Sequence, residues 1–285
     1  FFGDRSALAL NLIQPIILAT LTVLAQFAAP ASINIHFFLV VSALWMGMTL
    51  TVREIVNERK LYARDRLVAL QPLAFFSGKL VNALLLLTPV ALLLYCSARL
   101  AVPIFIDEGP VRSQLQEASI LQSTFILWLA GVGGAIVGLA ISTLSKTERM
   151  AVMILPIALL LQVLLSRVVF GHSSHWDSQP IMPAAEAATI DQLPAQHSPF
   201  NPITSLDDYL DSDTSSWQGN LVMTGSFLMI TRPATALLDM SPSGRAPPDA
   251  VGVEWIYLLC LMAVYLAITA VMFLMVESKW IGELR

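Results

Sequence analysis

Hydrophobic residues run in long, nearly uninterrupted stretches along this chain, and short polar segments separate them. A helix that crosses a membrane needs about 20 predominantly apolar residues. Six stretches are of that kind, at approximately residues 6–29, 35–52, 72–98, 119–144, 150–170 and 255–276. The pattern therefore predicts an all-α membrane protein in which a single domain, residues 1–285, contains six transmembrane helices.

Residues that break helices in water occur inside these stretches, at positions that suit membrane helices. Pro15 lies in the first stretch and Pro156 in the fifth, and membrane helices tolerate proline. The fourth stretch contains Gly131, Gly133, Gly134 and Gly138. Small residues let two membrane helices approach closely, so we expect the fourth helix to pack tightly against a neighbour.

The longest polar part of the chain, residues 171–250, separates the fifth and sixth stretches and is rich in acidic residues, Pro and Ser. Within it, residues 221–230 are apolar again but are too few to cross a membrane. Two structures fit this short stretch: a re-entrant or interfacial helix that closes this side of the protein, or a loop packed on the membrane surface.

The composition supports a membrane protein. Hydrophobic residues make up 56% of the chain and charged residues 13%, whereas soluble domains contain about 25% charged residues. Cys96 and Cys260 are the only cysteines, and both lie in apolar stretches. We therefore expect two buried thiols and no disulfide framework, and we expect membrane lipids, not nucleic acid, as surroundings.

Eleven of the 16 Lys and Arg residues fall on one side of the six predicted crossings. That side holds Arg5, Arg53, Arg59, Lys60, Arg64, Arg66, Lys79, Lys146, Arg149, Lys279 and Arg285, and the other side holds Arg99, Arg112, Arg167, Arg232 and Arg245. Basic residues are enriched in the cytoplasmic segments of membrane proteins. We therefore expect both termini to be cytoplasmic and residues 171–250 to be external.

The densest group of charges follows the second stretch, at residues 53–66. Between Arg5 and Arg53 the chain has no charged residue. Glu54, Glu58 and Asp65 have no Lys or Arg three or four positions away, so the usual helical ion pairs cannot neutralise them. Two interpretations stay open. One is a solvated loop whose basic residues contact anionic lipid headgroups. The other is a docking helix for a cytoplasmic partner, in which Glu54 and Glu58 also pair with other inner segments of the chain.

The sequence from Val52 to Arg66 resembles the loop after the second membrane helix in type-2 ABC exporters of the G-subfamily kind. The pattern there is roughly E-x-x-x-E-R-x-x-[FY]-x-R-[ED], and Asp65 stands where Glu is usual. Residues 67–80, with Pro72 and Gly78-Lys79, resemble bacterial members that join FHA domains, an ATPase and a permease in one polypeptide. The resemblance covers the six-helix plan, the charged loop and the long external segment.

The resemblance implies a permease domain that pairs with a second copy in a bacterial inner (plasma) membrane. Each copy would dock on a nucleotide-binding domain, which carries the ATP and Mg, through a cytoplasmic coupling helix between the second and third membrane helices. The residues that the resemblance assigns to coupling are Arg53, Glu54, Asn57, Glu58, Arg59, Tyr62, Arg64, Asp65 and Arg66. Movement of this helix would switch the membrane helices between inward-open and outward-open states.

The resemblance also implies a substrate cavity between the second and fifth membrane helices of the two copies. Those helices supply Phe38, Trp45, Met48, Met153, Leu161 and Leu164. Such apolar side chains suit a lipid, a lipid-linked glycan or a hydrophobic small molecule. The alternative function is a mechanotransmitter or scaffold, in which ATP-driven movement acts on a periplasmic partner through the external segment and no substrate passes.

Several expected motifs are missing from the sequence. No G-x-x-x-x-G-K-[ST] phosphate-binding loop occurs, so we expect a chain that is not itself an ATPase and holds no cofactor, with the ATPase upstream of residue 1 or on a second chain.

No charge lies at mid-depth in a span, which favours an external energy source over proton coupling. Lys79 and Arg99, at the ends of the third stretch, and Arg167, near the outer end of the fifth, are interpreted as snorkelling. His172 and His175 are interpreted as an interfacial polar cluster and not as metal ligands.

Overall fold

The computed structural model describes residues 5–28, 35–66, 70–106, 112, 115–116, 118–164, 229–240 and 248–283. The chain divides into two compact units, the first formed by Phe1–Val163 with Ile230–Arg285 and the second by Leu164–Met229. Of the second unit only the two end residues are described. The helices and contacts of the described residues therefore belong almost entirely to the first unit.

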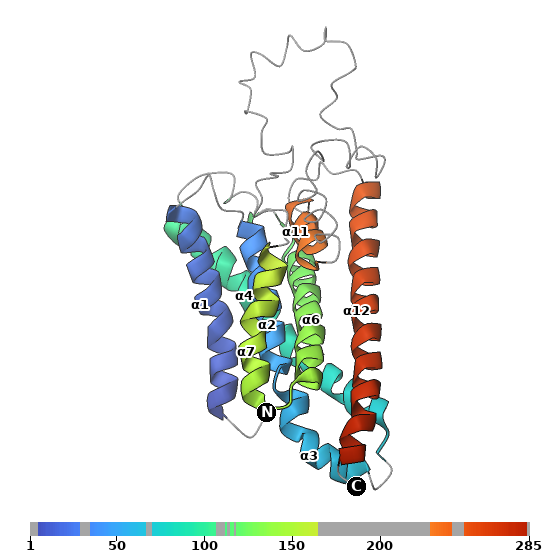
Figure 1. The fold of residues 1–285 in the computed structure, drawn as a ribbon. Coiled ribbons are helices and arrows are strands. Elements are labelled where there is room, and N and C mark those ends of the chain that lie inside the picture. The colour runs from blue at the N-terminus through green and yellow to red at the C-terminus, as the bar shows by residue number, and fades with distance from the viewer. Residues whose placement is uncertain are drawn as a thin grey trace, which may run out of the picture. The chain divides into compact units, whose positions relative to one another are not determined.

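All regular structure in the described residues is helical, which confirms the predicted all-α fold class. The helices are α1 (Arg5–Ala28), α2 (Ile35–Thr51), α3 (Glu54–Arg66), α4 (Pro72–Phe105), α6 (Ile120–Leu144), α7 (Glu148–Leu164), α11 (Thr231–Met240) and α12 (Pro248–Glu283) (Figure 1). Among the described residues, four helical segments are long and apolar enough to cross a membrane, and α1 contains a shorter apolar helix. The count of six crossings stays a prediction.

Two helices run well beyond the apolar stretches from which they were predicted. α4 continues through Pro89 and Pro103 as far as Phe105, and α12 begins at Pro248 and ends at Glu283. Backbone hydrogen bonding extends a helix into polar flanks as readily as through apolar residues, so hydropathy alone underestimates the length.

Helices α2 and α6 form the centre of the bundle because glycines allow their backbones to touch. A Cβ atom at Gly47 would overlap the carbonyl oxygen of Gly131, and one at Gly134 would overlap the carbonyl oxygen of Leu44. Neither overlap can be relieved by a side-chain rotation, since both partners are backbone atoms. The predicted close packing of the fourth membrane helix is thus confirmed, and its neighbour is α2.

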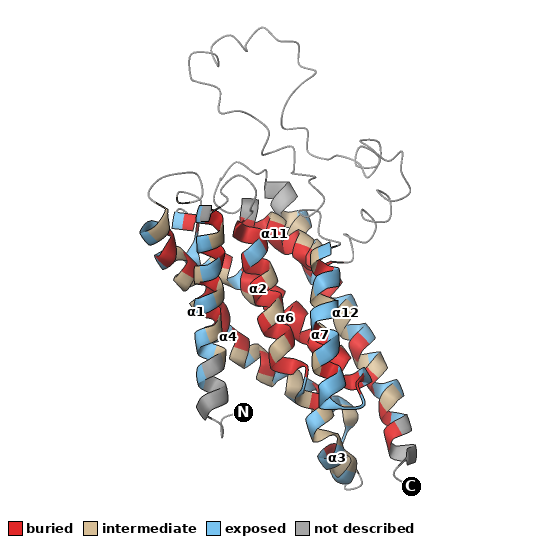
Figure 2. Ribbon diagram, turned by 60° about the vertical axis from the view of Figure 1, so that its left-hand side comes forward, coloured by how far each residue is buried: buried red, intermediate tan, exposed pale blue. Residues whose placement is uncertain are grey.

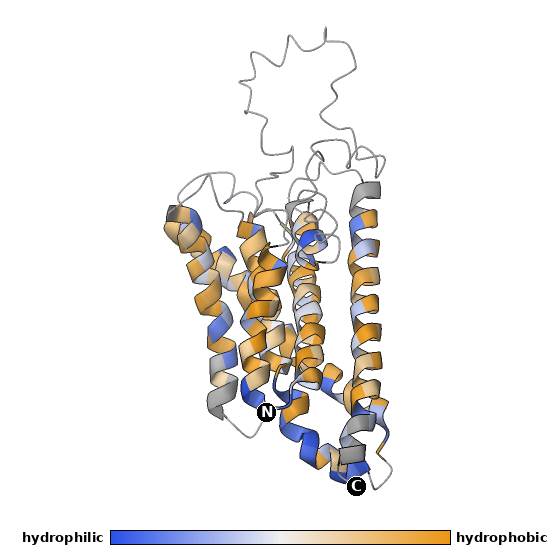
Figure 3. Cartoon of the chain, viewed as in Figure 1, coloured by the Kyte–Doolittle hydropathy of each residue, from blue (hydrophilic) through white to orange (hydrophobic). Residues whose placement is uncertain are grey.

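The remaining helices surround this centre and leave apolar faces uncovered. α1 packs on α4, and α12 packs on α6, α11 and α4. Buried residues gather on α2, α6 and α11, whereas α1, α7 and α12 carry many exposed positions (Figure 2). Those exposed positions are mainly large hydrophobic residues, and the hydropathy colouring shows α12 as largely apolar along its length (Figure 3). An apolar outer surface of this kind matches the hydrocarbon of a bilayer.

Helix α11 was not predicted from the sequence. It spans Thr231–Met240, and Ala234, Leu237 and Leu238 are buried in the same core as α2, α6 and α12. The apolar stretch 221–230, the predicted re-entrant helix, lies outside the described residues except for its last two. His172, His175 and the end of the fifth predicted stretch also lie outside them.

Candidate functional site at helix α3

Helix α3 begins directly after α2, separated from it only by a turn at Val52 and Arg53. The first amide groups of a helix have no carbonyl partner within the helix. Here the Ser142 hydroxyl, near the end of α6, accepts hydrogen bonds from the backbone N–H groups of Ile55 and Val56, each at 3.0 Å. The start of α3 is therefore capped by a side chain from another helix, which ties α3 to α6.

One face of α3 is apolar and buried. Ile55 and Tyr62 are seven positions apart, two helical turns, so they lie on the same side, and both are buried. The Tyr62 ring lies 4.5 Å from the Phe75 ring and 5.9 Å from the Phe273 ring, measured between centroids. These aromatic contacts place α3 against the start of α4 and the end of α12.

A buried carboxylate in α12 binds the end of α3. Glu277 Oε1 accepts a hydrogen bond from the Tyr62 hydroxyl at 3.1 Å and from Arg66 Nε at 2.8 Å. Burial, together with the hydrogen bond to Glu277, raises the pKa of the Tyr62 hydroxyl. Tyr62 therefore stays protonated and remains a donor, and the Glu277 charge is compensated by the Arg66 guanidinium.

The two glutamates of α3 share one lysine from α4. Lys79 Nζ lies 2.8 Å from Glu54 Oε2 and also forms an ion pair with Glu58 Oε1. The structure thus confirms that Glu54 and Glu58 pair with another segment of the chain, the start of α4. The prediction that Lys79 snorkels to the membrane surface is wrong. Its ammonium group points to α3, and its side chain is mostly buried.

Arg59 completes the inward contacts. Its Nη2 atom donates a hydrogen bond to the carbonyl oxygen of Ser145, just after α6, and its guanidinium lies 4.1 Å from the centre of the Trp280 ring in α12. A guanidinium over an indole ring is a favourable cation–π contact. Arg59 therefore bridges α6 and α12 through α3.

The opposite face of α3 is exposed, and we call it the outward stripe. It consists of Asn57, Lys60, Leu61 and Arg64, which follow one another at helical spacing and are all exposed. The stripe combines two basic groups, an amide and a leucine. It carries no acidic group.

The nine residues predicted for coupling are thus divided between two faces. Glu54, Glu58, Arg59, Tyr62 and Arg66 face the chain itself, whereas Asn57 and Arg64 belong to the outward stripe. Arg53 forms an exposed ion pair with Glu148 at 3.2 Å, and Asp65 one with Arg64 at 3.4 Å. Lys60 and Leu61 were missed, although their spacing from Asn57 and Arg64 was readable in the sequence.

The residues predicted for the substrate cavity are not brought together within one chain. Phe38, Met153, Leu161 and Leu164 are exposed, Trp45 is half-buried and Met48 is fully buried. Met48 packs with Ala151 and Leu155 of α7, so the space beside it is filled in this conformation. The exposed members lie on α2 and α7, the helices on which the cavity was predicted.

Comparisons with known proteins identify a family and a relative of this chain. The family model described as "ABC-2 type transporter" matches residues 1–175. The ABC transporter ATP-binding/permease protein Rv1747 of Mycobacterium tuberculosis is 25% identical over 193 residues, which are 64% of this chain and 21% of that protein. The chain thus spans about a fifth of the length of the relative it matches.

Proposed function

Because this chain belongs to the ABC-2 type transporter family, we propose that it is the permease domain of an ATP-driven exporter in a bacterial inner membrane. Membrane domains of this family are permease modules that work with ATP-binding domains. The ATP and Mg would be bound by such a domain, fused upstream or on a second chain. The mycobacterial relative is named as a protein that combines ATP binding with a permease.

The observation that carries the proposal is the division of α3 into two faces. A coupling helix must be held firmly by the membrane domain and must also offer a surface to its partner. The inward face is held by Ser142 of α6, Lys79 of α4 and Glu277 of α12. The outward stripe remains for the ATP-binding domain, and its basic groups suit an acidic surface with an apolar recess for Leu61.

These contacts would transmit a movement of α3 to the other helices. A displacement of α3 would act on α2 through the chain and on three further helices through side chains. Since ion pairs and buried hydrogen bonds resist separation, the helices would move together and not one at a time. We propose that this movement switches the domain between inward-open and outward-open states.

The exposed basic residues at one end of the bundle support an orientation of the domain in the membrane. α1 begins, α12 ends and α3 lies at one end (Figure 1), where Arg53, Lys60 and Arg64 are exposed. The enrichment of basic residues supports a cytoplasmic location for this end and for both termini. The external segment 171–250 would then face the other side.

For the cargo, we propose a lipid, a lipid-linked glycan or a hydrophobic small molecule, carried between two copies of the domain. The support is the exposed apolar surface of α7, including Met153, Leu161 and Leu164, together with Phe38 of α2. A mechanotransmitter that moves its external segment without passing substrate is the second candidate, and the experiment below separates the two.

The test is charge reversal on the outward stripe, with Lys60→Glu and Arg64→Glu combined in the full transporter. We expect the ATPase activity to lose its stimulation by lipid, and transport into vesicles to stop, while the protein still purifies as a folded species. Lys146→Glu is the matched control, because Lys146 is exposed after α6 but lies outside the stripe. If the stripe variant keeps its ATPase stimulation and its transport, the stripe has no coupling role. If the unaltered transporter shows ATPase stimulation by lipid but no flux into vesicles, the mechanotransmitter is favoured.

A further inference from the structure

Two side chains of opposite charge lie near each other at the end of the bundle opposite α3, where α11 packs on the start of α12 (Figure 1). Arg232 is in the first turn of α11, and Glu254 is in the second turn of α12. The Arg232 charge is close enough to act on the Glu254 carboxylate. This pair belongs neither to α3 nor to the α7 surface proposed for cargo.

Tyr257 completes this group, which we call the charge cluster. It follows Glu254 by three positions and so lies one turn further on the same side of α12. The Arg232 guanidinium lies 5.9 Å from the centre of the Tyr257 ring, within the range of a cation–π contact. A guanidinium carries five N–H donors in a planar fork. Arg232 can therefore contact the ring and also donate hydrogen bonds to a phosphate group.

The Glu254 carboxylate has an oxygen that no donor satisfies. Its Oε2 atom is buried and accepts no hydrogen bond from the residues that the structure describes. An ionised carboxylate is costly away from water unless it is paired and hydrogen-bonded. A primary ammonium group would supply three donors together with the opposite charge. An amine is thus the kind of group that Glu254 would bind.

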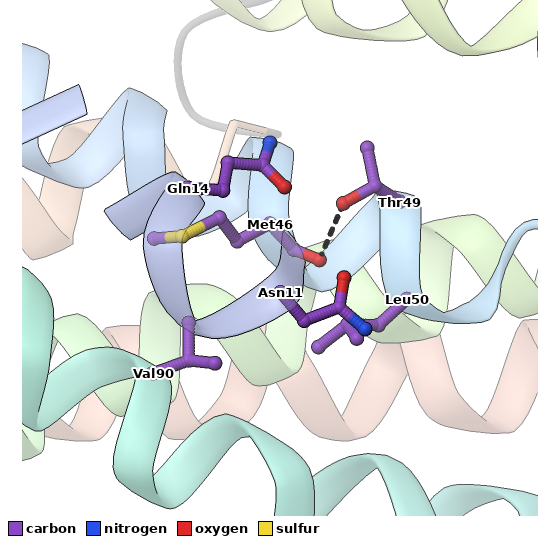
Figure 4. A pocket seen from close by; sticks show the side chains of 6 residues that line it. All are labelled: Asn11, Gln14, Met46, Thr49, Leu50 and Val90. Carbon is purple, nitrogen blue, oxygen red and sulfur yellow. Dashed lines mark hydrogen bonds between the residues drawn. The ribbon is translucent and has the colours of Figure 1, made fainter. Parts of the chain in front are cut away.

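The charge cluster is accessible from outside the bundle, unlike the crevice between α1, α2 and α4. That crevice has essentially no room for a water molecule. Its lining residues are Asn11, Gln14, Met46, Thr49, Leu50 and Val90 (Figure 4). Arg232 and Glu254 are half-buried instead. A ligand would therefore reach them from the surrounding membrane without entering the bundle.

The depth of the charge cluster matches the headgroup region of a bilayer. With a rise of about 1.5 Å per residue, Glu254 and Glu277 are about 35 Å apart along α12. Glu277 contacts the polar helix α3 and so marks one boundary of the membrane. Since the hydrocarbon core is about 30 Å thick, Glu254 lies at the opposite boundary, where lipid phosphates and amines are found.

Exposed apolar side chains of α12 continue from the charge cluster into the membrane. Val253, Ile256, Val264 and Val271 are all exposed. Their spacing puts them on the same side of the helix as Tyr257. Because α12 runs from the charge cluster toward α3, acyl chains that start at this cluster would lie along these side chains toward the bilayer centre.

The ligand must therefore combine a phosphate, a primary amine and acyl chains. We propose that the charge cluster binds the headgroup of phosphatidylethanolamine in the leaflet opposite α3, with the phosphate at Arg232 and the ammonium at Glu254. Phosphatidylglycerol has the phosphate but no ammonium, and phosphatidylcholine has an ammonium without N–H donors. Glu254 is thus the residue that selects the lipid, and this site does not depend on transport.

The test uses phosphatidylethanolamine with a photoactivatable acyl chain, in phosphatidylglycerol nanodiscs that contain the full transporter without ATP. We expect labelled peptides from the first half of α12, identified by mass spectrometry. Glu254→Gln should reduce this labelling about tenfold, the loss of one charge-assisted hydrogen bond. Glu148→Gln is the matched control, because it makes the same change at an exposed glutamate that pairs with Arg53 beside α3.

A photoactivatable phosphatidylglycerol distinguishes the two charges of the cluster. Arg232→Gln should reduce labelling by both lipids, because both carry a phosphate. Glu254→Gln should reduce labelling by phosphatidylethanolamine alone. If Glu254→Gln weakens both lipids equally, or neither, Glu254 does not bind the ammonium and the proposal is overturned.

Competition on the unaltered protein guards against misfolding of the variants. Unlabelled phosphatidylethanolamine should displace the probe at lower concentration than phosphatidylglycerol, phosphatidylcholine or glycerophosphoethanolamine, which lacks acyl chains. Equal displacement by phosphatidylglycerol or phosphatidylcholine would overturn the selection for a primary amine. Equal displacement by glycerophosphoethanolamine would show a site for a soluble headgroup and not for a membrane lipid.

Discussion

The hydroxyl of Tyr62 and the carboxylate of Glu277 form a buried hydrogen bond of 3.1 Å between residues 215 positions apart. This bond joins the helix that we propose for coupling to the last membrane helix. Arg66 shares the same carboxylate oxygen. A movement of α3 must therefore either carry the end of α12 with it or break two hydrogen bonds to a buried charge.

The first prediction concerns the carboxylate at this junction. Glu277→Ala should lower the free energy of unfolding, because the buried Tyr62 hydroxyl loses its acceptor and the partly exposed Arg66 guanidinium loses its counter-charge. Tyr62→Phe, which removes one donor and keeps the ring packing, should cost about 1.5 kcal/mol. Thermal unfolding of the purified protein in detergent measures both.

The double variant distinguishes a direct bond from two separate packing effects. Because the phenylalanine variant has already lost the hydrogen bond to Glu277, the second substitution should cost less than it does alone. Costs that simply add would mean that Tyr62 and Glu277 stabilise the protein independently. Arg64→Ala serves as control, since Arg64 is exposed and pairs only with its neighbour Asp65 among the described residues.

The second prediction ranks the partners of Lys79. The exposed side-chain fraction is 14% for Lys79 and 10% for Glu54, but 42% for Glu58. Lys79→Met should cost about 3 kcal/mol because it leaves the Glu54 carboxylate buried without its counter-charge. Glu58→Gln should cost less than about 1 kcal/mol, as an exposed ion pair does.

The two glutamates also allow a test of specificity. If the loss in Lys79→Met comes from the stranded carboxylate, adding Glu54→Gln should restore part of the stability, whereas adding Glu58→Gln should restore little. The measurement is the unfolding midpoint of the four variants in the same detergent. Equal rescue by both substitutions would contradict the burial difference between the two pairs.

The sequence predicted the helices of this fold better than it predicted their contacts. Long apolar stretches determine where α4, α6 and α12 lie, because a helix is the way to satisfy backbone groups in a membrane. The tight α2–α6 contact was also partly readable, since closely spaced glycines have little other use in a membrane helix. α11 was missed because ten residues of mixed composition that include Pro233 are typical of a loop.

The candidate site shows why contacts between helices were harder to predict than the helices themselves. The absence of local partners for Glu54 and Glu58 was visible in the sequence, but it did not indicate which distant residue neutralises them. Lys79 and Glu277 reach α3 only after α4 and α12 have packed beside it. The two faces of α3 follow from helical spacing, yet only the positions of the neighbouring helices decide which face is buried.

The third prediction concerns the start of α3. Ser142→Ala removes the hydroxyl that accepts hydrogen bonds from the Ile55 and Val56 amides. Loss of a helix cap costs about 1 kcal/mol, and here the loss should be local. Hydrogen–deuterium exchange should accelerate at the first turn of α3 while the centre of α6 stays protected. Ser97→Ala is the control, because within the described residues the Ser97 hydroxyl donates to the Leu93 carbonyl oxygen of its own helix and to no other helix. Exchange at α3 that matches this control would mean that Ser142 does not hold the helix start.

The fourth prediction compares two glycines in helices. Gly134 faces α2 so closely that a Cβ atom would overlap the Leu44 carbonyl oxygen, whereas a Cβ atom at Gly78 of α4 would meet nothing within 4 Å. Gly134→Ala should therefore force α2 and α6 apart and cost about 2 kcal/mol, as overpacking does. Gly78→Ala should be neutral or raise the stability by up to about 1 kcal/mol, because alanine favours the helix.

The same chemical change at both positions isolates the effect of the neighbouring backbone. Both variants add one methyl group to a helix, so helix propensity acts in the same direction in each, and only the contact with α2 differs. Unfolding midpoints measured side by side give the difference directly. Two equal midpoints would mean that α2 and α6 do not touch at Gly134, and the ion pairs and hydrogen bonds of α3 would then have to hold the centre of the bundle without that contact.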